Sequence, residues 1–497
     1  MRRLPLAIAL AAVPALLAAG CATTGSPASQ GSRHPVGQGL SAGSAGDPGI
    51  AFRAATSANR LTAWPTYHRT NGRSGVANGQ ATLPLHHAWT ANLDGAVYGE
   101  PLVVGDTLIV ATENDSVYGL NPANGARRWQ THLATPESQS DIGGCGDVFP
   151  LGITGTPAYD AKNGSVFVVA ESLGGHHTLW ALNASNGHRR WHRTMDVLPS
   201  RDRRMEQQRS ALLVAHGRIY TTYGGLYGDC GNYVGYITST ATTGKGTTHH
   251  YAVPTSREAG MWSTEGPIEG ANGNIYVASG NGGQLSGRWD KSDSVTELAP
   301  TTLRRIAVFA PSSWRQDNLQ DLDLGSSSPV PVDGRIVIAG KRGVVYLLSQ
   351  GLGGVGHEIR SLSGCTAFGG AAHVGDTVLM PCQSSGVSAL KVGKRSLHWA
   401  WQSNVYGSPV IARSRVYVAT GGSPGRLDVL SLSTGTPRNP ANAVSSAAAA
   451  ATSSSSSRWR SVTSPWRPIE QRTMACPDPA RWSHLVDAKV TALTGRP

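Results

Sequence analysis

Charged and aromatic residues are both scarce in this chain of 497 residues, at 15% and 6% of the sequence. Glycine is abundant, with 61 residues, and it does not follow the period of a collagen. This composition is too rich in turns for a helical bundle and too apolar for a disordered chain. The chain is also long enough to bury an extensive core. We therefore predict an all-β protein built from many short strands.

Positive charge is in excess but is not concentrated. The chain has 43 Lys and Arg against 31 Asp and Glu, a formal net charge of +12 and an isoelectric point near 9.6. A basic protein of this kind can bind nucleic acid or an anionic surface. The arginines are scattered along the sequence, however, and no nucleic-acid-binding motif accompanies them. We expect no nucleic-acid partner.

Long apolar runs are missing after the N-terminus, where no stretch reaches the 18 residues of a membrane-spanning helix. The N-terminus itself has two arginines, an apolar run over 4–19 and then Gly20 and Cys21, as in a secretory signal peptide. Residues 17–21 resemble the lipobox of bacterial lipoproteins. This implies a signal peptide over 1–20 and an extracytoplasmic protein anchored to the bacterial membrane by lipid on Cys21. The alternative is an ordinary cleaved signal with an incidental cysteine.

Residues 21–60 are rich in Gly, Ser, Ala and Pro, which is typical of a flexible tether. The five later cysteines include no adjacent pair and no pair at the spacing of a zinc finger. In an oxidising compartment, Cys365 and Cys382 are candidates for a disulfide across one hairpin, and Cys145 and Cys230 for a longer-range disulfide. Cys476 is left over.

A short apolar strand, a tight turn and a second β-branched strand recur seven times. The seven units begin at Pro101, Pro157, Leu212, Pro267, Pro329, Ala371 and Pro409. Turn pairs such as Asn163-Gly164 and Asp333-Gly334 supply the positive φ angles of two-residue hairpins. The number of units disfavours a β-sandwich and their long period disfavours a β-helix. We predict a β-propeller of four-stranded blades.

The ends of several units carry a tryptophan at a fixed offset from a Leu-Asn pair. Residues 120–129 (LNPANGARRW) recur as 182–191 (LNASNGHRRW), so that Trp129 and Trp191 can wedge between neighbouring blades. A degenerate copy ends at Trp399. These repeats resemble the tryptophan-docking repeats of the pyrroloquinoline quinone (PQQ) β-propellers, the superfamily of the quinoprotein alcohol dehydrogenases and of an outer-membrane assembly scaffold. The resemblance covers residues 61–436 and implies the fold.

Closure of the ring is the open point of this prediction. The family usually has eight blades, whereas we count seven units. Residues 437–497 have a low-complexity composition without alternating strands, and we expect a disordered tail there. Either the last blade is replaced or lost, or a seven-bladed ring is closed by the early strand around residues 86–93.

The resemblance also implies candidate site residues. In the quinoprotein dehydrogenases PQQ stacks on a tryptophan, Glu and Asn ligands hold Ca²⁺, and an aspartate acts as base. Matching positions here are Trp262 for the stack, Asn281 and Glu171 for the metal, and Asp321 for the base. An arginine for the quinone is less clear, with Arg342 as a candidate.

Each of these residues also has a structural interpretation. Trp262 would then be an inter-blade wedge, Asn281 a left-handed turn residue, and Asp321 a turn or cap residue. The chain also lacks the adjacent cysteines found in many of these dehydrogenases. We therefore expect a monomeric binding or scaffold protein of the cell envelope, without a cofactor, that binds a protein or envelope ligand at its loops. The alternative is a Ca²⁺- and PQQ-dependent dehydrogenase that oxidises an alcohol or a sugar.

Overall fold

The computed structural model describes residues 63–81, 83–420, 426–438 and 489–495. The expected signal peptide, Cys21, the tether and Cys476 lie outside these residues. Within the described part of the chain, no helix is long and apolar enough to cross a membrane.

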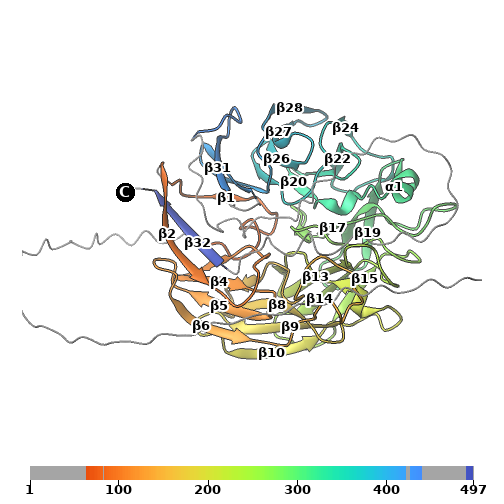
Figure 1. Cartoon of the computed structure of the whole chain (residues 1–497). Coiled ribbons are helices and arrows are strands. Elements are labelled where there is room, and N and C mark those ends of the chain that lie inside the picture. The colour runs from red at the N-terminus through yellow and green to blue at the C-terminus, as the bar shows by residue number, and fades with distance from the viewer. Residues whose placement is uncertain (1–62, 82, 421–425, 439–488, 496–497) are drawn as a thin grey trace, which may run out of the picture. The chain divides into compact units, whose positions relative to one another are not determined.

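Seven sheets, five of four strands and two of five, follow one another along the chain as blades 1 to 7 (Figure 1). Blade 1 comprises β3 (Leu102–Val104), β4 (Thr107–Ala111), β5 (Ser116–Leu120) and β6 (Arg127–His132). Blade 2 comprises β7 (Ala158–Asp160), β8 (Ser165–Ser172), β9 (His176–Asn183) and β10 (Arg189–Thr194). Blade 3 comprises β12 (Leu213–Ala215), β13 (Arg218–Gly225), β14 (Tyr236–Ala241) and β15 (His249–Ala252). Blade 4 comprises β16 (Ile268–Glu269), β17 (Ile275–Ser279), β18 (Ser294–Leu298) and β19 (Arg305–Ala310).

The remaining blades repeat the pattern with small variations. Blade 5 comprises β20 (Val330–Val332), β21 (Arg335–Ala339), β22 (Val344–Ser349) and β24 (Arg360–Ser363). Blade 6 comprises β25 (Ala372–Val374), β26 (Thr377–Cys382), β27 (Gly386–Val392) and β28 (Leu397–Gln402). Blade 7 comprises β29 (Pro409–Ala412), β30 (Arg415–Thr420) and β31 (Arg426–Ser431), with β1 (Val76–Ala77) as a parallel fourth strand on the inner edge beside β29. The predicted all-β propeller with seven hairpin units is confirmed.

Short elements decorate these sheets. Strand β11 (Glu206–Gln207) pairs with β13, and β23 (Gly354–Val355) pairs with β19. Helix α1 (Trp314–Gln320) and the 3₁₀ turns η1 (Arg203–Met205) and η2 (Leu324–Ser326) lie in connections between blades.

Successive strands of each blade are antiparallel, apart from β1, so the connections divide between two faces. The turn after the second strand and the connection to the next blade emerge on the same face, which we call the loop face. The hairpin turns after the first and third strands emerge on the opposite face. Every candidate site residue from the sequence lies in or beside a loop-face connection.

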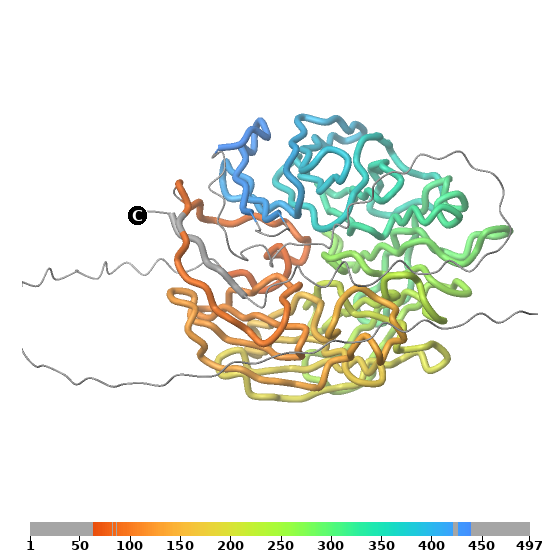
Figure 2. Tube along the Cα trace, viewed as in Figure 1, coloured from red at the N-terminus to blue at the C-terminus, as the bar shows by residue number. Residues whose placement is uncertain are grey.

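The segment 64–77, here called the axial segment, touches the innermost strand region of all seven blades. Its backbone bonds to Val103, Tyr159, Glu269, His373 and Ile411 of blades 1, 2, 4, 6 and 7. The buried guanidinium of Arg73 donates to the carbonyl oxygen of Leu212, immediately before blade 3, at 3.1 Å. Gly72 lies against Pro331 of blade 5. Figure 2 shows this red-orange start of the described chain beside its blue end.

Tryptophans link several blades at their outer strands. Trp129 of blade 1 packs on the turn at Gly187 of blade 2, and Trp191 packs in the same way on Gly244 of blade 3. Between these sheets, Ile109 of blade 1 and Val166 of blade 2 belong to one apolar cluster. The predicted docking arrangement is therefore present at these two seams.

The degenerate unit in blade 6 behaves differently from the prediction. Trp399 donates to the carbonyl oxygen of Ser363 in the preceding blade at 3.0 Å. Trp401 makes the contact with the following blade, where it packs on Gly435 and donates to the Leu432 oxygen at 2.9 Å. The β-bulge of this strand pair is also present in blades 1 and 2, but here the pair continues past Leu390 to Val392 and Leu397 before the turn. This longer hairpin explains why counting along the sequence selects Trp399 and not Trp401.

The chain ends form an additional two-stranded sheet. Strand β2 (Leu85–Asn92) pairs antiparallel with β32 (Lys489–Gly495) and not with blade 7, where β1 lies on the inner edge beside β29. Trp89 of β2 packs on Gly125 of blade 1 and donates to the Pro122 oxygen at 2.9 Å, as a docking tryptophan of a preceding blade does. The expected strandless tail over 437–497 thus ends in a strand, while residues 439–488 lie outside the described residues.

Replacing Gly187 by alanine tests the docking contact. A Cβ there would lie 2.4 Å from the Trp129 ring, and φ is +73°. We expect a loss of about 2–4 kcal/mol in unfolding free energy, from overpacking and backbone strain together. The control Gly217→Ala has φ +69° and no atom within 4 Å of the new Cβ, so it should lose only about 1–2 kcal/mol from the backbone. Equal losses in chemical denaturation would contradict the docking role.

Candidate functional site

Two polar clusters lie on the loop face. The first, the axial cluster, consists of Trp262, Asn281, Asp323 and Lys341. The second, the histidine cluster, consists of Glu171, His177, Asp196 and Glu206. Between them they contain three of the candidate residues from the sequence.

Trp262 is the aromatic centre of the axial cluster. It is half-buried in the connection between blades 3 and 4. The Arg209 guanidinium lies 5.8 Å and the Lys341 ammonium 5.7 Å from its ring centroid. Phe368, from the connection into blade 6, lies 6.1 Å away at a tilt of 47°. Trp262 is therefore placed among loops of several blades and is not an outer-strand wedge like Trp129.

Asp323 is the carboxylate that joins this cluster. It accepts from the backbone N–H of Asn281 at 2.7 Å and pairs with the Lys341 ammonium at 2.6 Å. A side chain on Gly280 would collide with the Asp323 carboxylate, so glycine permits this close approach. Burial alone would lower the pKa of Lys341, but Asp323 and Asp321 raise it above its ordinary value.

Asp321, the predicted base, lies at the edge of the cluster. It ends helix α1 in the left-handed conformation, with φ 52°, and its side chain is half-exposed. Its carboxylate pairs with Lys341 at 2.9 Å. The cap interpretation is thus realised, and Asp323 is the aspartate beside Trp262 and Asn281. Arg342, the candidate for the quinone, instead pairs with Asp317 of α1.

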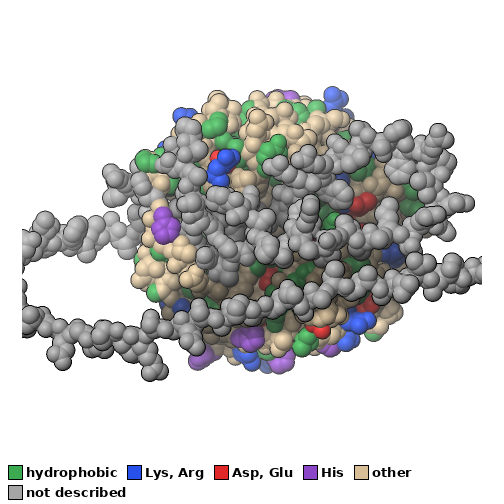
Figure 3. Space-filling model, in the orientation of Figure 1, with side chains coloured by type: hydrophobic (Ala, Val, Ile, Leu, Met, Phe, Trp, Pro, Cys, Tyr) green, Lys and Arg blue, Asp and Glu red, His purple; other side chains and the backbone are tan. Residues whose placement is uncertain are grey.

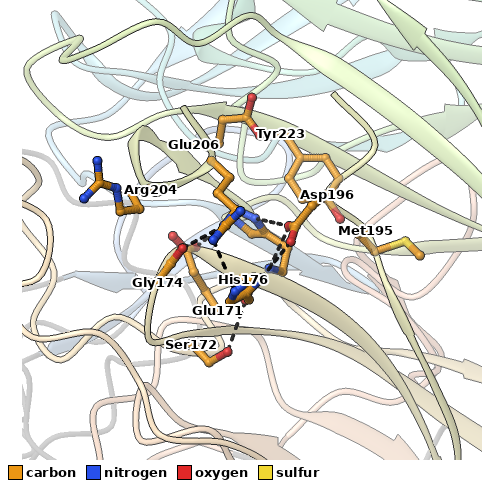
Figure 4. A network of polar contacts seen from close by, with 12 residues as sticks. Glu171, Ser172, Gly174, His176, Met195, Asp196, Arg204, Glu206 and Tyr223 are labelled. Carbon is orange, nitrogen blue, oxygen red and sulfur yellow. Dashed lines mark hydrogen bonds and ion pairs between the residues drawn. The ribbon is translucent and has the colours of Figure 1, made fainter. Parts of the chain in front are cut away.

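The histidine cluster is buried between blades 2 and 3 (Figure 4). His177 and Glu171 are fully buried on neighbouring strands β9 and β8, with Nε2 of the histidine 3.5 Å from Oε2 of the glutamate. The other ring nitrogen, Nδ1, lies 3.4 Å from Oδ1 of Asp196. Burial would lower the pKa of His177, but Glu171 and Asp196 raise it to about 10.

Further acidic side chains are buried close to blade 1. Glu113 and Asp115 lie in the turn between β4 and β5, and both are fully buried. Burial raises the pKa of Glu113 to about 8 and that of Asp115 to about 9, and repulsion between the carboxylates adds to the shift of Asp115. Only Glu113 receives a backbone hydrogen bond, from Gly152 at 2.8 Å. Burial therefore favours the protonated form of both groups in the folded chain.

The residues that the resemblance assigns to calcium and the quinone make other contacts in the structure. No hydrogen bond or ion pair among the described residues joins Glu171 to Asn281, Trp262 or Asp321. The Glu171 carboxylate already faces an imidazole, and Asn281 contributes its backbone to Asp323 and Ala259. In the described part of the chain, no group of three or more His, Cys, Asp or Glu residues is arranged to hold a metal ion.

The loop face also carries an apolar area stabilised by a disulfide. Cys145, in the connection from blade 1 to blade 2, is bonded to Cys230 in a turn of blade 3. Ile142, Val148, Leu151 and Leu226 form a small core around this bond. The second disulfide, Cys365–Cys382, is buried at the start of blade 6. These are the two pairs that the sequence spacing favours.

Sequence reasoning missed several residues of these clusters. Asp323 lies two residues after Asp321, the predicted base. The close approach of the Asp323 carboxylate to Gly280, which distinguishes it from Asp321, is visible only in three dimensions. Lys341 adjoins Arg342, the residue selected for the quinone. His177 and His176 are adjacent on β9, and neighbouring residues of a strand point to opposite faces. The two rings do differ, since His177 is buried and His176 is half-exposed.

Comparisons with known proteins agree with the repeat pattern. A family model described as outer membrane protein assembly factor BamB matches residues 86–226. No curated protein matches the chain.

Solved structures share the propeller. A quinohemoprotein alcohol dehydrogenase from Pseudomonas putida HK5 is 14% identical, with a TM-score of 0.57 over 76% of this chain and 71% of its own. The corresponding enzyme from Comamonas testosteroni is 17% identical, with a TM-score of 0.56 over 76% and 72%. A europium-containing methanol dehydrogenase is 15% identical, with a TM-score of 0.57 over 76% and 84%. The predicted resemblance to PQQ-type propellers is confirmed at the level of the fold.

The buried carboxylic acids predict an unusual pH dependence of stability. Between its ordinary pKa near 4 and about 9, Asp115 binds a proton in the folded chain but not in the unfolded chain. The contribution of Asp115 to the unfolding free energy is therefore fully present below pH 4 and is lost as pH rises toward 9. Asparagine tolerates the positive φ of 52° at this position. We therefore expect the unfolding free energy of Asp115→Asn to fall less steeply between pH 6 and 9 than that of the wild type. The exposed Asp106→Asn should leave the profile unchanged, and matching profiles for the two variants would contradict the assignment.

Proposed function

Starting from a propeller of PQQ-type repeats, we propose that this protein is a non-catalytic binding or scaffold protein of the bacterial cell envelope. Its loop face engages another envelope protein. The fold supplies a rigid ring, and the long connections on one face supply the contact surface, in keeping with the general placement of function on loops.

The distribution of exposed apolar side chains carries this proposal. Nine large apolar side chains of the described residues are exposed. Six of them lie in loop-face connections: Phe149, Leu173, Tyr227, Leu285, Leu319 and Tyr406. Phe149 and Tyr227, at 36% and 54% exposure, flank the Cys145–Cys230 disulfide, so their backbones are held in place. Exposed aromatic side chains on an ordered surface are typical of protein-binding sites.

The family model supports the same role and compartment. It describes an assembly factor of the outer membrane, and the matched residues 86–226 include the connection that carries Cys145 and Phe149. Two disulfides agree with an oxidising compartment outside the cytoplasm. We further propose that lipid on Cys21 anchors the protein to the membrane.

The charge pattern favours a partner that is not a polyanion. On the visible part of the face in Figure 3, blue and red side chains are interspersed with apolar and neutral ones. Many arginines on the loop face are also engaged by backbone carbonyls, as Arg203 is by Gly174 and Arg257 by Asp229. This agrees with the expectation of no nucleic-acid partner.

The alternative is the Ca²⁺- and PQQ-dependent dehydrogenase. The neighbourhood of Trp262, Asp323 and Lys341 favours it, because an aromatic ring beside a carboxylate and a cation suits a flat anionic ligand. The surroundings of Glu171 favour the scaffold instead, since the carboxylate expected to hold Ca²⁺ faces the imidazole of His177. We rank the scaffold first for this reason.

Photo-crosslinking tests the scaffold proposal. A photoreactive phenylalanine analogue at position 149 or 227 should give discrete protein adducts in intact envelopes, because these side chains would lie in the interface. The matched control is Ile306, which is 45% exposed on outer strand β19. Tyr227→Ser should reduce the adduct formed from position 149 by about tenfold, the effect of losing one interface anchor. Equal adducts from position 306, or none from 149 and 227, would contradict the proposal.

Titration with PQQ tests the alternative. We expect neither absorbance changes nor a shift in Tm when PQQ is added to the wild-type protein with or without Ca²⁺, because a ligand that binds only the folded state would raise the midpoint. Binding that requires Ca²⁺ and disappears in Asn281→Ala would overturn our ranking and favour the dehydrogenase.

A further inference from the structure

We propose that the outer end of blade 4 carries a second contact surface, which lies on the anionic surface of a membrane. This surface, here called the blade 4 rim, takes its side chains from the β17–β18 connection, strand β19 and helix α1: Leu285, Arg288, Lys291, Arg305, Arg315 and Leu319. The inference goes beyond the proposed function and shares with it only the location in the cell envelope. It assigns Leu285 and Leu319 to lipid and leaves Phe149 and Tyr227 as the protein contact.

The β17–β18 connection is fastened to helix α1, which lies at the periphery of the ring in Figure 1. The backbone N–H of Gly282 donates to Oδ1 of Asn318 at 3.0 Å, and Nδ2 of Asn318 donates to the Gln284 oxygen at 3.0 Å. The Arg315 guanidinium donates to the Gly287 oxygen at 2.9 Å. The connection and the helix therefore form one unit and present their outer side chains together.

Two leucines make the outside of this unit apolar. Asn318 is buried, whereas Arg315 and Leu319, four residues apart on α1, are exposed on the same side of the helix. Leu319 is 61% exposed and Leu285 is 50% exposed. Each leucine directly follows a residue of the hydrogen bond between Asn318 and Gln284, so the two leucines belong to one surface.

Positive charge gathers beside the leucines. Within the described residues, the arginines and the lysine of the rim have no ion-pair partner. The Lys291 ammonium lies 4.0 Å from the centroid of the Trp289 ring. Burial lowers the pKa of Lys291, and the charges of Arg305 and Arg288 lower it further, although Asp290 opposes the shift. An anionic surface would relieve this repulsion between like charges.

An anionic membrane suits both the cations and the leucines of the rim. Lipid headgroups attract lysine and arginine, each of which adds about fivefold to the affinity. Apolar side chains next to the cations can enter the boundary of the acyl chains, and a tryptophan such as Trp289 suits the level of the headgroups. Protein interfaces, in contrast, are depleted in lysine. The net charge of +12 also favours an anionic surface.

Vesicle binding tests the proposal on the exported Cys21→Ser protein, in which no lipid on residue 21 can contribute. We expect it to bind vesicles containing phosphatidylglycerol about tenfold more tightly than vesicles of phosphatidylcholine alone, and high salt should remove this difference. In this background, Arg288→Gln/Lys291→Gln should bind the anionic vesicles about thirtyfold more weakly, because two cations are lost. The control Lys394→Gln/Arg395→Gln removes the same charges from the exposed β27–β28 turn on the opposite face, and its binding should not change.

The leucines supply a second readout. Leu285→Ser/Leu319→Ser should weaken binding to the anionic vesicles about tenfold and leave its salt dependence unchanged, because salt does not screen apolar insertion. An unchanged Tm would show that each variant is folded, as expected for substitutions at the surface.

Several outcomes would overturn the proposal. These are equal binding to anionic and neutral vesicles, and an equal loss in the rim variant and in the Lys394/Arg395 control. If the protein binds neither kind of vesicle, while the rim variant loses a cross-linked acidic protein, the surface serves a protein and not lipid. None of these outcomes would remove the adducts expected from positions 149 and 227, so the two proposals can fail separately.

Discussion

The innermost strands of the seven blades each turn one edge toward a common axis. A single chain segment contacts all of these edges. Residues 64–77 bond to six blades and pack on the fifth. The guanidinium of Arg73 is buried there and donates to the carbonyl oxygens of Leu212 and Pro267 at 3.1 and 3.0 Å. Unpaired backbone groups at this depth would be costly, so the blades depend on the segment for their relative positions.

Local patterns made the fold readable from the sequence. Hairpin turns at pairs such as Asn163-Gly164 and the Leu-Asn…Trp spacing depend on neighbouring residues, and both appear in the structure as expected. The disulfide pairs also follow from spacing, since each joins loops of the same or nearby blades. The docking tryptophan of blade 6 could not be read in this way, because the pair of β27 and β28 extends to Val392 and Leu397 before its turn and so places Trp401 where Trp399 was expected.

The candidate site was less predictable because its residues contact partners that are distant in sequence. Residues that are close in sequence can also direct their side chains to different places. Asp321 and Asp323 are two positions apart, yet the left-handed end of α1 leaves the first half-exposed and directs the second to Lys341. Glu171 resembled a metal ligand by position. In the structure it faces His177 of the adjacent strand. The sequence pattern does not show that the buried member of the adjacent histidine pair lies opposite this glutamate.

The pairing of β2 with β32 ties the order of folding to the order of synthesis. The axial segment and β2 emerge first, and each later blade finds its inner partner already present. The strand that pairs with β2 arrives last, after nearly the whole propeller. Until then one hydrogen-bonding edge of β2 lacks its partner strand, and an unpaired strand edge favours aggregation. Strand β32 therefore covers an edge that would otherwise stay exposed while the seven blades are being made.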